Sequence, residues 1–175
     1  MEKKLESELI FDGKVIKVYK DVVACENNTT AIREVVRHHG GVGILAIKDN
    51  NILLVKQYRY AYALDTLEIP AGKLELNEDT KICAMRELEE ETGYRTNDVT
   101  FLTRIMPTPG YCDEWLYIYY TNQLEKAIDP LACDDDEFID VVEMSIEEAY
   151  QKVIDGTIMD AKTVYAIMYA YINLR

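Results

Sequence analysis

Three glutamates, Glu87, Glu90 and Glu91, stand three and four residues apart in a segment that lacks helix breakers. On a helical wheel of about 100° per residue, their side chains fall within an arc of about 100°. Carboxylates this close repel one another, at about 0.2–0.5 kcal/mol per pair, and the last turn of a helix disfavours anions. Arg86 has the spacing to pair with Glu90, and Mg²⁺ or Mn²⁺ would offset the remaining charge because both prefer oxygen ligands. A solvated acidic face is the alternative for this helix taken alone.

The acidity of the chain is concentrated in two segments. Its 175 residues carry 19 Lys and Arg against 32 Asp and Glu, a net charge of −13. Residues 78–91 hold six acids and two bases, a contribution of −4, and the run Asp134-Asp135-Asp136-Glu137 adds another −4. This balance argues against a nucleic-acid partner, which needs clustered Lys and Arg, and against an anionic membrane surface. An anionic small molecule can still bind where a cation mediates the contact.

Strand-like runs surround the acidic helix. The first forty residues are rich in Val, Ile and Tyr and contain the turn Asp12-Gly13, which indicates antiparallel strands. The turn Lys48-Asp49-Asn50-Asn51 separates two apolar runs and indicates a hairpin. We expect strands at 15–24, 31–36, 42–47, 52–58, 66–69, 100–106, 115–121 and 138–144.

Three helices are expected. The first covers 78–92, with Asn77 as its N-cap, Gly93 at its end and an apolar face of Ile82, Met85 and Leu88. Ser145-x-x-Glu148 is a capping box for a helix that stops at Gly156. Asp160 caps the last helix, whose apolar side is expected to hold Ala161, Val164, Ile167, Met168, Tyr171 and Ile172. This order of elements predicts the α+β class, with a mixed or antiparallel sheet flanked by helices.

Cysteine usage and the N-terminus bear on the compartment. Cys25, Cys83, Cys112 and Cys133 lie far apart, and the adjacent His38 and His39 complete no zinc pattern, so we expect four reduced thiols in a cytoplasmic protein. The N-terminus has no apolar signal region. No apolar run approaches the ~20 residues of a membrane span, so no membrane partner is expected.

The acidic helix belongs to a longer pattern. Gly72, Glu78, Arg86-Glu87-Leu88, Glu90-Glu91 and Gly93-Tyr94 reproduce the spacing G-x5-E-x7-R-E-U-x-E-E-x-G-U. In this pattern the sequence resembles the Nudix hydrolases, with Tyr94 in place of the usual aliphatic residue. The resemblance implies an α/β/α sandwich around a mixed sheet, and hydrolysis of a nucleoside diphosphate linked to another moiety with Mg²⁺ or Mn²⁺.

The resemblance extends beyond this block. Residues 55–59 (Val-Lys-Gln-Tyr-Arg), 67–75 (Leu-Glu-Ile-Pro-Ala-Gly-Lys-Leu-Glu) and 160–163 (Asp-Ala-Lys-Thr) are similar to the ADP-ribose pyrophosphatase branch of the family. That branch carries a Ser-Pro-Gly-type loop after the block, and here the loop reads Pro107-Thr108-Pro109-Gly110. We expect residues 1–40 to form an N-terminal β region that mediates a homodimer, and 41–175 to form the Nudix domain.

The resemblance implies roles for the acidic residues. The Ala71 carbonyl, Glu87 and Glu91 would hold the metal, with Glu90 bridging or just behind them, and Arg86 would orient Glu90 and Glu78. A loop carboxylate would position or deprotonate the attacking water. Glu137 is the expected one, although any of the four acids at 134–137 fits, and a merely solvated loop is the alternative.

Substrate contacts are also implied by the resemblance. They are expected from Arg59, Glu75, Thr108 and Gly110, and from Arg33 and Glu34 reaching the site of a neighbouring subunit; for Arg33 an ordinary surface charge is the alternative. The expected reaction is hydrolysis of ADP-ribose to AMP and ribose 5-phosphate. Hydrolysis of other nucleotide sugars or dinucleotides is the alternative among enzymes, and a non-catalytic ADP-ribose sensor is the alternative of another class.

Overall fold

The computed structural model describes residues 1–133 and 138–174, which form two compact units. The first unit holds Met1–Gly40 together with Met106–Trp115. The second holds Gly41–Ile105 and the described residues from Leu116 onward. The chain therefore passes between the units three times, after residues 40, 105 and 115.

The first unit is built on a three-stranded antiparallel sheet in the order β1-β2-β3, which confirms the antiparallel strands expected there. Its strands are β1 (Lys3–Asp12), β2 (Ile16–Ala24) and β3 (Thr30–His38). The loop 106–115 is bound to β3: the Val36 N–H donates to the Tyr111 carbonyl at 2.7 Å, and the Asp113 N–H donates to the Val36 carbonyl at 3.1 Å. Arg37 Nη1 and the His38 N–H both donate to the Asp113 carboxylate, at 2.9 and 3.0 Å.

The second unit contains the mixed sheet that the sequence predicts, with the strand order β12-β5-β4-β10-β9. These strands are β12 (Asp140–Ser145), β5 (Asn51–Arg59), β4 (Gly41–Lys48), β10 (Leu116–Thr121) and β9 (Thr100–Ile105). β10 runs parallel to β4, and the other neighbours are antiparallel. A parallel pair needs a long crossover, and the segment between β4 and β10 supplies one that contains the first helix.

Short strands complete this unit. β6 (Leu64–Glu68) pairs with β5, β7 (Ala71–Lys73) pairs with β4, and β8 (Tyr94–Arg95) pairs with β11 (Glu125–Lys126). The expected strand at 138–144 begins later, because Phe138 lies outside β12 and is largely exposed. The expected hairpin at 48–51 is present, with Asp49 and Asn50 at positive φ between β4 and β5.

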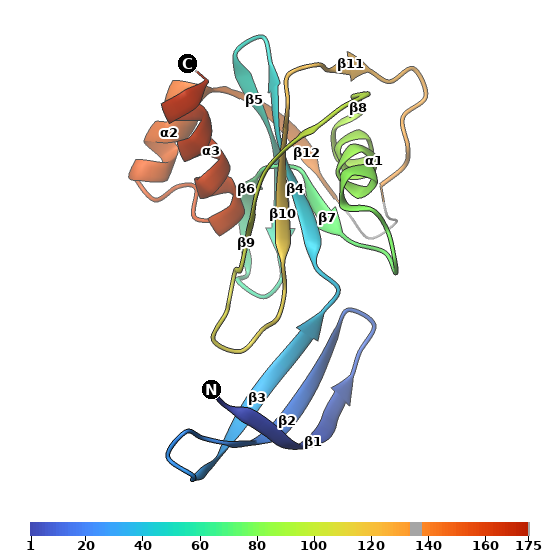
Figure 1. Ribbon diagram of the computed structural model, residues 1–175. Coiled ribbons are helices and arrows are strands. Elements are labelled where there is room, and N and C mark those ends of the chain that lie inside the picture. The colour runs from blue at the N-terminus through green and yellow to red at the C-terminus, as the bar shows by residue number, and fades with distance from the viewer. Residues whose placement is uncertain (134–137, 175) are drawn as a thin grey trace. The chain divides into compact units, whose positions relative to one another are not determined.

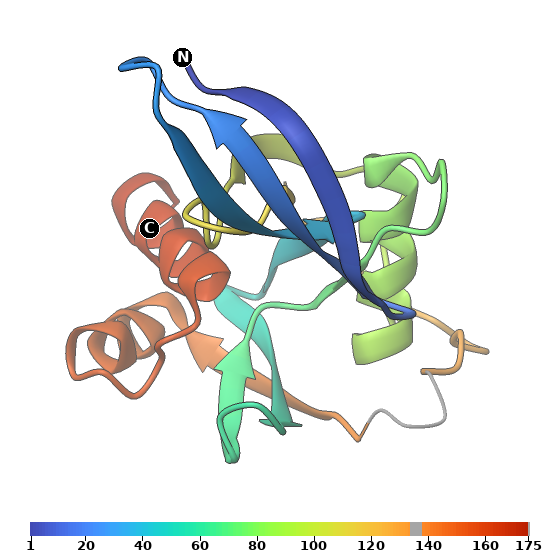
Figure 2. The ribbon, with the colours of Figure 1, turned by 90° about the horizontal axis from the view of Figure 1, so that it is seen from below.

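Helices cover both faces of the mixed sheet. α1 (Thr80–Thr92) lies on one side, and α2 (Ile146–Ile154) and α3 (Ala161–Asn173) lie together on the other (Figure 1). The view from below keeps the same separation (Figure 2). Two apolar cores correspond to the two faces: Cys83, Ala84 and Leu88 of α1 pack with Val42 and Ile44, while α2 and α3 pack over Leu45 and Leu54.

The start of α1 differs from the expectation. Asp79 is the N-cap, and its carboxylate accepts from the N–H groups of Lys81 and Ile82 at 2.9 and 3.1 Å. Asn77, the expected N-cap, has a positive φ of 64° and belongs to the preceding turn. The end is as expected: Gly93, at φ 68°, donates its N–H to the Glu89 carbonyl at 2.8 Å.

The expected apolar faces of α1 and α3 are partly wrong. In α1, Leu88 is buried and Met85 partly buried, but Ile82 is exposed, because the packed face also includes Glu87 and Glu91. In α3 the packed face holds Thr163, Ala166, Ile167 and Ala170 together with Lys162, whereas Ala161 and Ile172 are exposed. Ser145 caps α2 as expected, accepting from the Glu148 N–H at 3.2 Å, and the helix ends at Ile154, two residues before Gly156.

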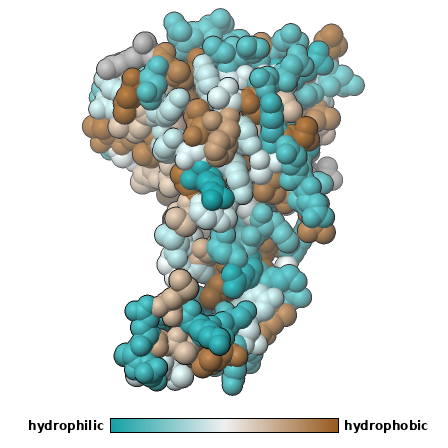
Figure 3. Space-filling model, in the orientation of Figure 1, coloured by the Kyte–Doolittle hydropathy of each residue, from teal (hydrophilic) through white to brown (hydrophobic). Residues whose placement is uncertain are grey.

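The surface is mixed in character. On the face shown in Figure 3, hydrophobic residues lie scattered among hydrophilic ones. All four cysteines are free thiols. Within 1–133 and 138–174, no helix is long and apolar enough to cross a membrane.

Candidate active site

Arg86 of α1 gathers three carboxylates around one guanidinium. Its Nε and Nη2 donate to the two oxygens of Glu78 at 3.0 and 3.1 Å, so this pair has two-point geometry. Its Nη1 donates to Glu87 Oε1 at 2.9 Å and to Glu90 Oε2 at 2.7 Å. Glu90 lies one helical turn after Arg86, and Glu78 lies in the turn that precedes α1. Three carboxylates and one guanidinium leave this group with a formal charge of −2.

The ion pair between Arg86 and Glu78 shifts the pKa values of both residues. The hydrogen bonds from Arg86 hold the pKa of Glu78 below its ordinary value, against the opposing effect of burial. The same contact with Glu78 raises the pKa of Arg86 further, with contributions from Glu87 and Glu90. Both groups therefore stay charged at neutral pH, and Arg86 remains a fixed cation.

Glu75 helps to place Glu78. The Glu75 N–H donates to Glu78 Oε2 at 3.0 Å, and the Glu78 N–H donates to the Glu75 carbonyl at 3.1 Å. The structure thus brings Glu75 next to the Arg86 group through its backbone, while its own side chain is exposed.

Glu87 packs directly against the backbone of β7. A Cβ added to Gly72 would lie 1.8 Å from the Glu87 carboxylate carbon and 1.9 and 2.2 Å from its oxygens. Only glycine leaves room for the carboxylate here. The pattern that links Gly72 with Glu87 across fourteen intervening positions thus has a steric basis.

Glu91 is tied to the same stretch of backbone. Its Oε2 accepts from the Ala71 N–H at 2.8 Å, and its side chain is buried. Ala71, Glu87 and Glu91, three of the residues expected to hold a metal, are therefore adjacent. Glu90, the fourth, is joined to them by Arg86.

The donor set fits a hard divalent cation. Glu87, Glu90 and Glu91 supply carboxylate oxygens from one side of α1, and Gly72 keeps the space for one of them free of a side chain. Oxygen donors of this kind suit Mg²⁺ and Mn²⁺. As they stand in the described part of the chain, no three His, Cys, Asp or Glu side chains are grouped so that they could hold a metal ion, and Arg86 engages two of these carboxylates.

Arg59 lies in a second charged group in the same unit. Its Nε and Nη2 donate to the two oxygens of Glu68 at 2.7 and 2.6 Å. Glu68 is buried and also accepts from Lys162 and from Thr66 Oγ1, the latter at 2.6 Å. Burial alone would raise the pKa of Glu68, but its hydrogen bonds to Arg59 and its contact with Lys162 lower it to about 2. The hydrogen bonds to Glu68 raise the pKa of Arg59, and the charge of Glu91 adds to this shift.

The other expected substrate residues lie in the first unit. The Thr108 carbonyl accepts from the Cys112 N–H at 3.0 Å, and Gly110 faces open space. Arg33 Nε donates to Glu2 Oε2 at 3.1 Å, so within its unit Arg33 forms a surface ion pair. Glu34 lines a groove with Tyr19. Glu137 and the three aspartates before it lie outside the described residues.

Sequence reasoning missed the buried partners of these groups. Lys162, Thr163 and Glu68 lie in segments that resemble the family, but nothing in the sequence assigns them a role. The sequence also does not indicate that Cys83 Sγ accepts from Arg86 Nη2 at 3.4 Å. Neither the charge of these residues nor the hydrophobic periodicity of the sequence predicts their burial. A lysine next to an N-cap, for example, is normally solvated.

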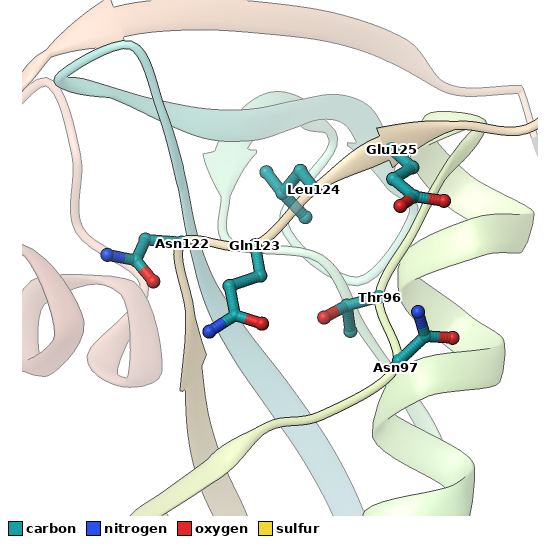
Figure 4. Close-up of a pocket in the computed structure, with 6 residues that line it drawn as sticks. All are labelled: Thr96, Asn97, Asn122, Gln123, Leu124 and Glu125. Atoms are coloured by element: carbon teal, nitrogen blue, oxygen red, sulfur yellow. The ribbon is translucent and has the colours of Figure 1, made fainter.

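A polar cavity of about 270 Å³ lies near the C-terminal end of α1 (Figure 4). Its lining comes from the segment after β8 and the segment after β10, and consists of Thr96, Asn97, Asn122, Gln123, Leu124 and Glu125. None of these residues belongs to the Arg86 or Arg59 groups.

Comparisons with known proteins identify the family of this chain. The chain is 42% identical to a protein described as "Methanol dehydrogenase activator" from Bacillus methanolicus and 41% identical to the ADP-ribose pyrophosphatase of Bacillus subtilis (strain 168); each alignment covers 96% of this chain and 91% of the relative. A crystal structure described as an ADP compounds hydrolase superposes with a TM-score of 0.86 over 97% of this chain and 92% of that one, at 22% identity, and so shares the fold. The NUDIX domain model matches residues 37–165. With Glu78, Glu87 and Glu90 held around Arg86 and Glu91 bound to the Ala71 N–H, the chain belongs to the NUDIX domain family.

Proposed function

We propose that this protein hydrolyses the pyrophosphate bond of ADP-ribose in the presence of Mg²⁺ or Mn²⁺, giving AMP and ribose 5-phosphate. The observation that carries the proposal is the intact group of Glu78, Glu87 and Glu90 around Arg86, with Glu91 bound to the Ala71 N–H. A domain that only sensed ADP-ribose would have no need of all these carboxylates. The 41% identity to the Bacillus subtilis ADP-ribose pyrophosphatase supports the choice of substrate.

In this proposal Glu87, Glu91, the Ala71 carbonyl and Glu90 would hold the metal. A cation bound there would neutralise charge on the diphosphate and lower the pKa of a water molecule. Arg86 holds Glu87 and Glu90 in place and stays cationic throughout. A carboxylate of the 134–137 run, with Glu137 as the first candidate, positions or deprotonates the attacking water.

In the second unit, Arg59 is proposed as the diphosphate contact, because its guanidinium is fixed by Glu68 yet its side chain is 41% exposed. Glu75, beside the Arg86 group, is a further proposed substrate contact. For the first unit, Thr108 and Gly110 stay predicted substrate contacts, and Arg33 and Glu34 stay predicted contacts to the substrate of a second subunit.

We propose that residues 1–40 mediate a homodimer. The three-stranded sheet exposes Leu9, Ile10, Phe11 and Ile32. It also carries a groove of about 540 Å³ that is lined by Val18, Val35 and Tyr111 among others. Exposed apolar side chains gathered on a small unit are typical of an interaction surface. Light scattering should give the mass of a dimer, and Ile10→Asp should give a monomer, whereas Ile172→Asp, at an exposed position on α3, should not. A monomeric parent would contradict the proposal.

We also propose a cytoplasmic location, in keeping with the four free thiols.

The function is tested on a panel of ADP-ribose, ADP-glucose, GDP-mannose and NADH. Phosphate released by a coupled phosphatase gives the rate, and ¹⁸O-labelled water identifies which product takes up the solvent oxygen. ADP-ribose should be the preferred substrate, and Glu90→Gln should lose most activity while Glu89→Gln, on the same helix but outside the Arg86 group, keeps it. Better turnover of a non-adenosine substrate would point to the other hydrolase activity. Binding of ADP-ribose without metal-dependent hydrolysis of any substrate would point to a sensor.

The relative described as an activator supports a second candidate, stimulation of methanol dehydrogenase. The test adds the protein with Mg²⁺ to that dehydrogenase and follows the rate of methanol oxidation. If the wild-type protein raises the rate and the Glu90→Gln variant does not, the stimulation requires the hydrolytic site, and the two functions are linked.

A further inference from the structure

The first turn of α3 buries polar groups that the proposed catalytic set does not use. Lys162 is only 6% exposed and Thr163 is fully buried. Burying an ammonium group is costly unless it is paired and hydrogen-bonded. The partners of Lys162 and Thr163 therefore indicate what the turn does.

Lys162 is linked to Arg59 through the carboxylate of Glu68. Its Nζ contacts Glu68 and lies 3.0 Å from Asp160 Oδ2. Glu68, 2% exposed, receives the two-point contact from Arg59. Lys162 and Thr66 thus hold Glu68 from one side while Glu68 fixes the guanidinium from the other. The outward part of Arg59 remains accessible.

Thr163 is linked to Glu91 through the backbone of residues 69–71. Its Oγ1 accepts from the Ile69 N–H at 2.8 Å and donates to Asp160 Oδ2 at 2.6 Å. Two residues after Ile69, the Ala71 N–H donates to Glu91. The segment from Ile69 to Ala71 is thereby anchored to α3 at one end and to α1 at the other, across the sheet.

We propose that Lys162 and Thr163 are positioning residues for the hydrolytic site: Lys162 aligns Arg59 through Glu68, and Thr163 sets the Ala71 backbone against Glu91. The ligand that Arg59 then receives is a nucleoside diphosphate. This inference rests on the proposed function, since it assigns Arg59 to the diphosphate.

The Lys162 arm is tested by a double-mutant cycle with Arg59→Ala and Lys162→Met. Residues that support a metal or substrate ligand from behind contribute about 10- to 100-fold to affinity or activity, so Lys162→Met should raise KM for ADP-ribose about tenfold or more with a smaller change in kcat. If Lys162 acts through Arg59, the double variant should be no worse than Arg59→Ala alone. Lys126→Met, an exposed lysine of β11, should leave KM unchanged. Additive losses in KM would overturn the Lys162 assignment.

The Thr163 arm needs a measurement that does not depend on turnover. Thr163→Val removes the acceptor for the Ile69 N–H, and electron paramagnetic resonance of Mn²⁺ should show weaker metal binding to the free protein. Thr163→Ser, which keeps the hydroxyl, should restore it. Unchanged Mn²⁺ affinity in Thr163→Val, with the variant folded by circular dichroism, would overturn this assignment.

The controls separate the inference from the function it rests on. If Lys162→Met does not fold, the cycle is run with Lys162→Gln, which retains a hydrogen-bond donor. A wild-type protein that hydrolyses no diphosphate refutes the proposed function, whereas an active wild type with an unchanged KM in both Lys162 variants refutes the positioning role alone.

Discussion

Gly72→Ala tests whether the backbone of β7 shapes the catalytic carboxylates. The added Cβ would meet the Glu87 carboxylate at 1.8 Å from its carbon and 1.9 Å from its nearer oxygen. Non-bonded carbon atoms settle at about 3.5–4.0 Å, so the carboxylate must move by well over 1 Å. That movement breaks the 2.9 Å hydrogen bond from Arg86 Nη1 to Glu87.

The size of the effect follows from this displacement. A misplacement of about 1 Å in a catalytic arrangement can cost about 100-fold in rate, so kcat for ADP-ribose should fall by about 100-fold or more. Stability should fall by about 1–3 kcal/mol, the usual cost of overpacking. Gly72 does not have a positive φ, so no backbone strain adds to this figure.

The assay compares Gly72→Ala, Glu87→Ala and the double variant. Initial rates of Mg²⁺-dependent hydrolysis report the site, and urea unfolding reports stability. Truncating Glu87 removes the clash, so the double variant should be no slower than Glu87→Ala and should regain the stability lost by Gly72→Ala. A near-wild-type rate for Gly72→Ala would refute the reasoning. So would independent, additive losses in the double variant, because the glycine would then act through some other group.

Three further predictions concern other residues. The pKa of Glu68 in the folded protein, about 2, lies below its ordinary value of 4.5, and at 1.36 kcal/mol per pH unit the difference is roughly 3 kcal/mol. This stabilisation is present above about pH 4.5 and is lost as the pH falls towards 2, so urea unfolding should show a steep acid loss that Glu68→Gln reduces; an equally steep loss in that variant would assign it to other carboxylates. Glu91→Gln should abolish most activity and raise the Mg²⁺ needed for the remainder while leaving the circular dichroism spectrum intact, and near-wild-type turnover would contradict the metal-ligand assignment. Asp79→Ala should cost about 1 kcal/mol through loss of the N-cap with little change in kcat, and an unchanged unfolding midpoint would show that the cap contributes nothing.

The residues that carry chemistry were the most predictable part of the molecule. The spacing of Glu87, Glu90 and Glu91 is a property of the sequence, and a helix brings such positions together whatever surrounds it. The pairing of Arg86 with Glu90 follows from the same geometry. Turn chemistry was equally local, as at Gly93, where a left-handed residue ends α1.

What could not be predicted depends on contacts between distant parts of the chain. The apolar side chain of Ile82 is exposed while the charged side chains of Glu87 and Glu91 are buried, because β7 packs against the acidic side of α1. Lys162 is buried because Glu68, 94 positions earlier, meets it there. Burial patterns from single-helix periodicity assume that charged faces point to solvent, and they fail where a site needs its charges inside.

Residues 106–115 belong to the first unit although they lie within the sequence of the second, and this limits how the protein can be shortened. A chain that begins at Gly41 would keep the mixed sheet and all three helices, yet its 106–115 loop would lose the backbone partners that Val36 provides and the cation that Arg37 offers to Asp113. That loop carries Thr108 and Gly110. The truncated chain would still contain both proposed substrate contacts, but the loop that positions them would have lost its partners. Residues 1–40 therefore support the conformation of a loop that lies much later in the chain, and they are not a detachable N-terminal module.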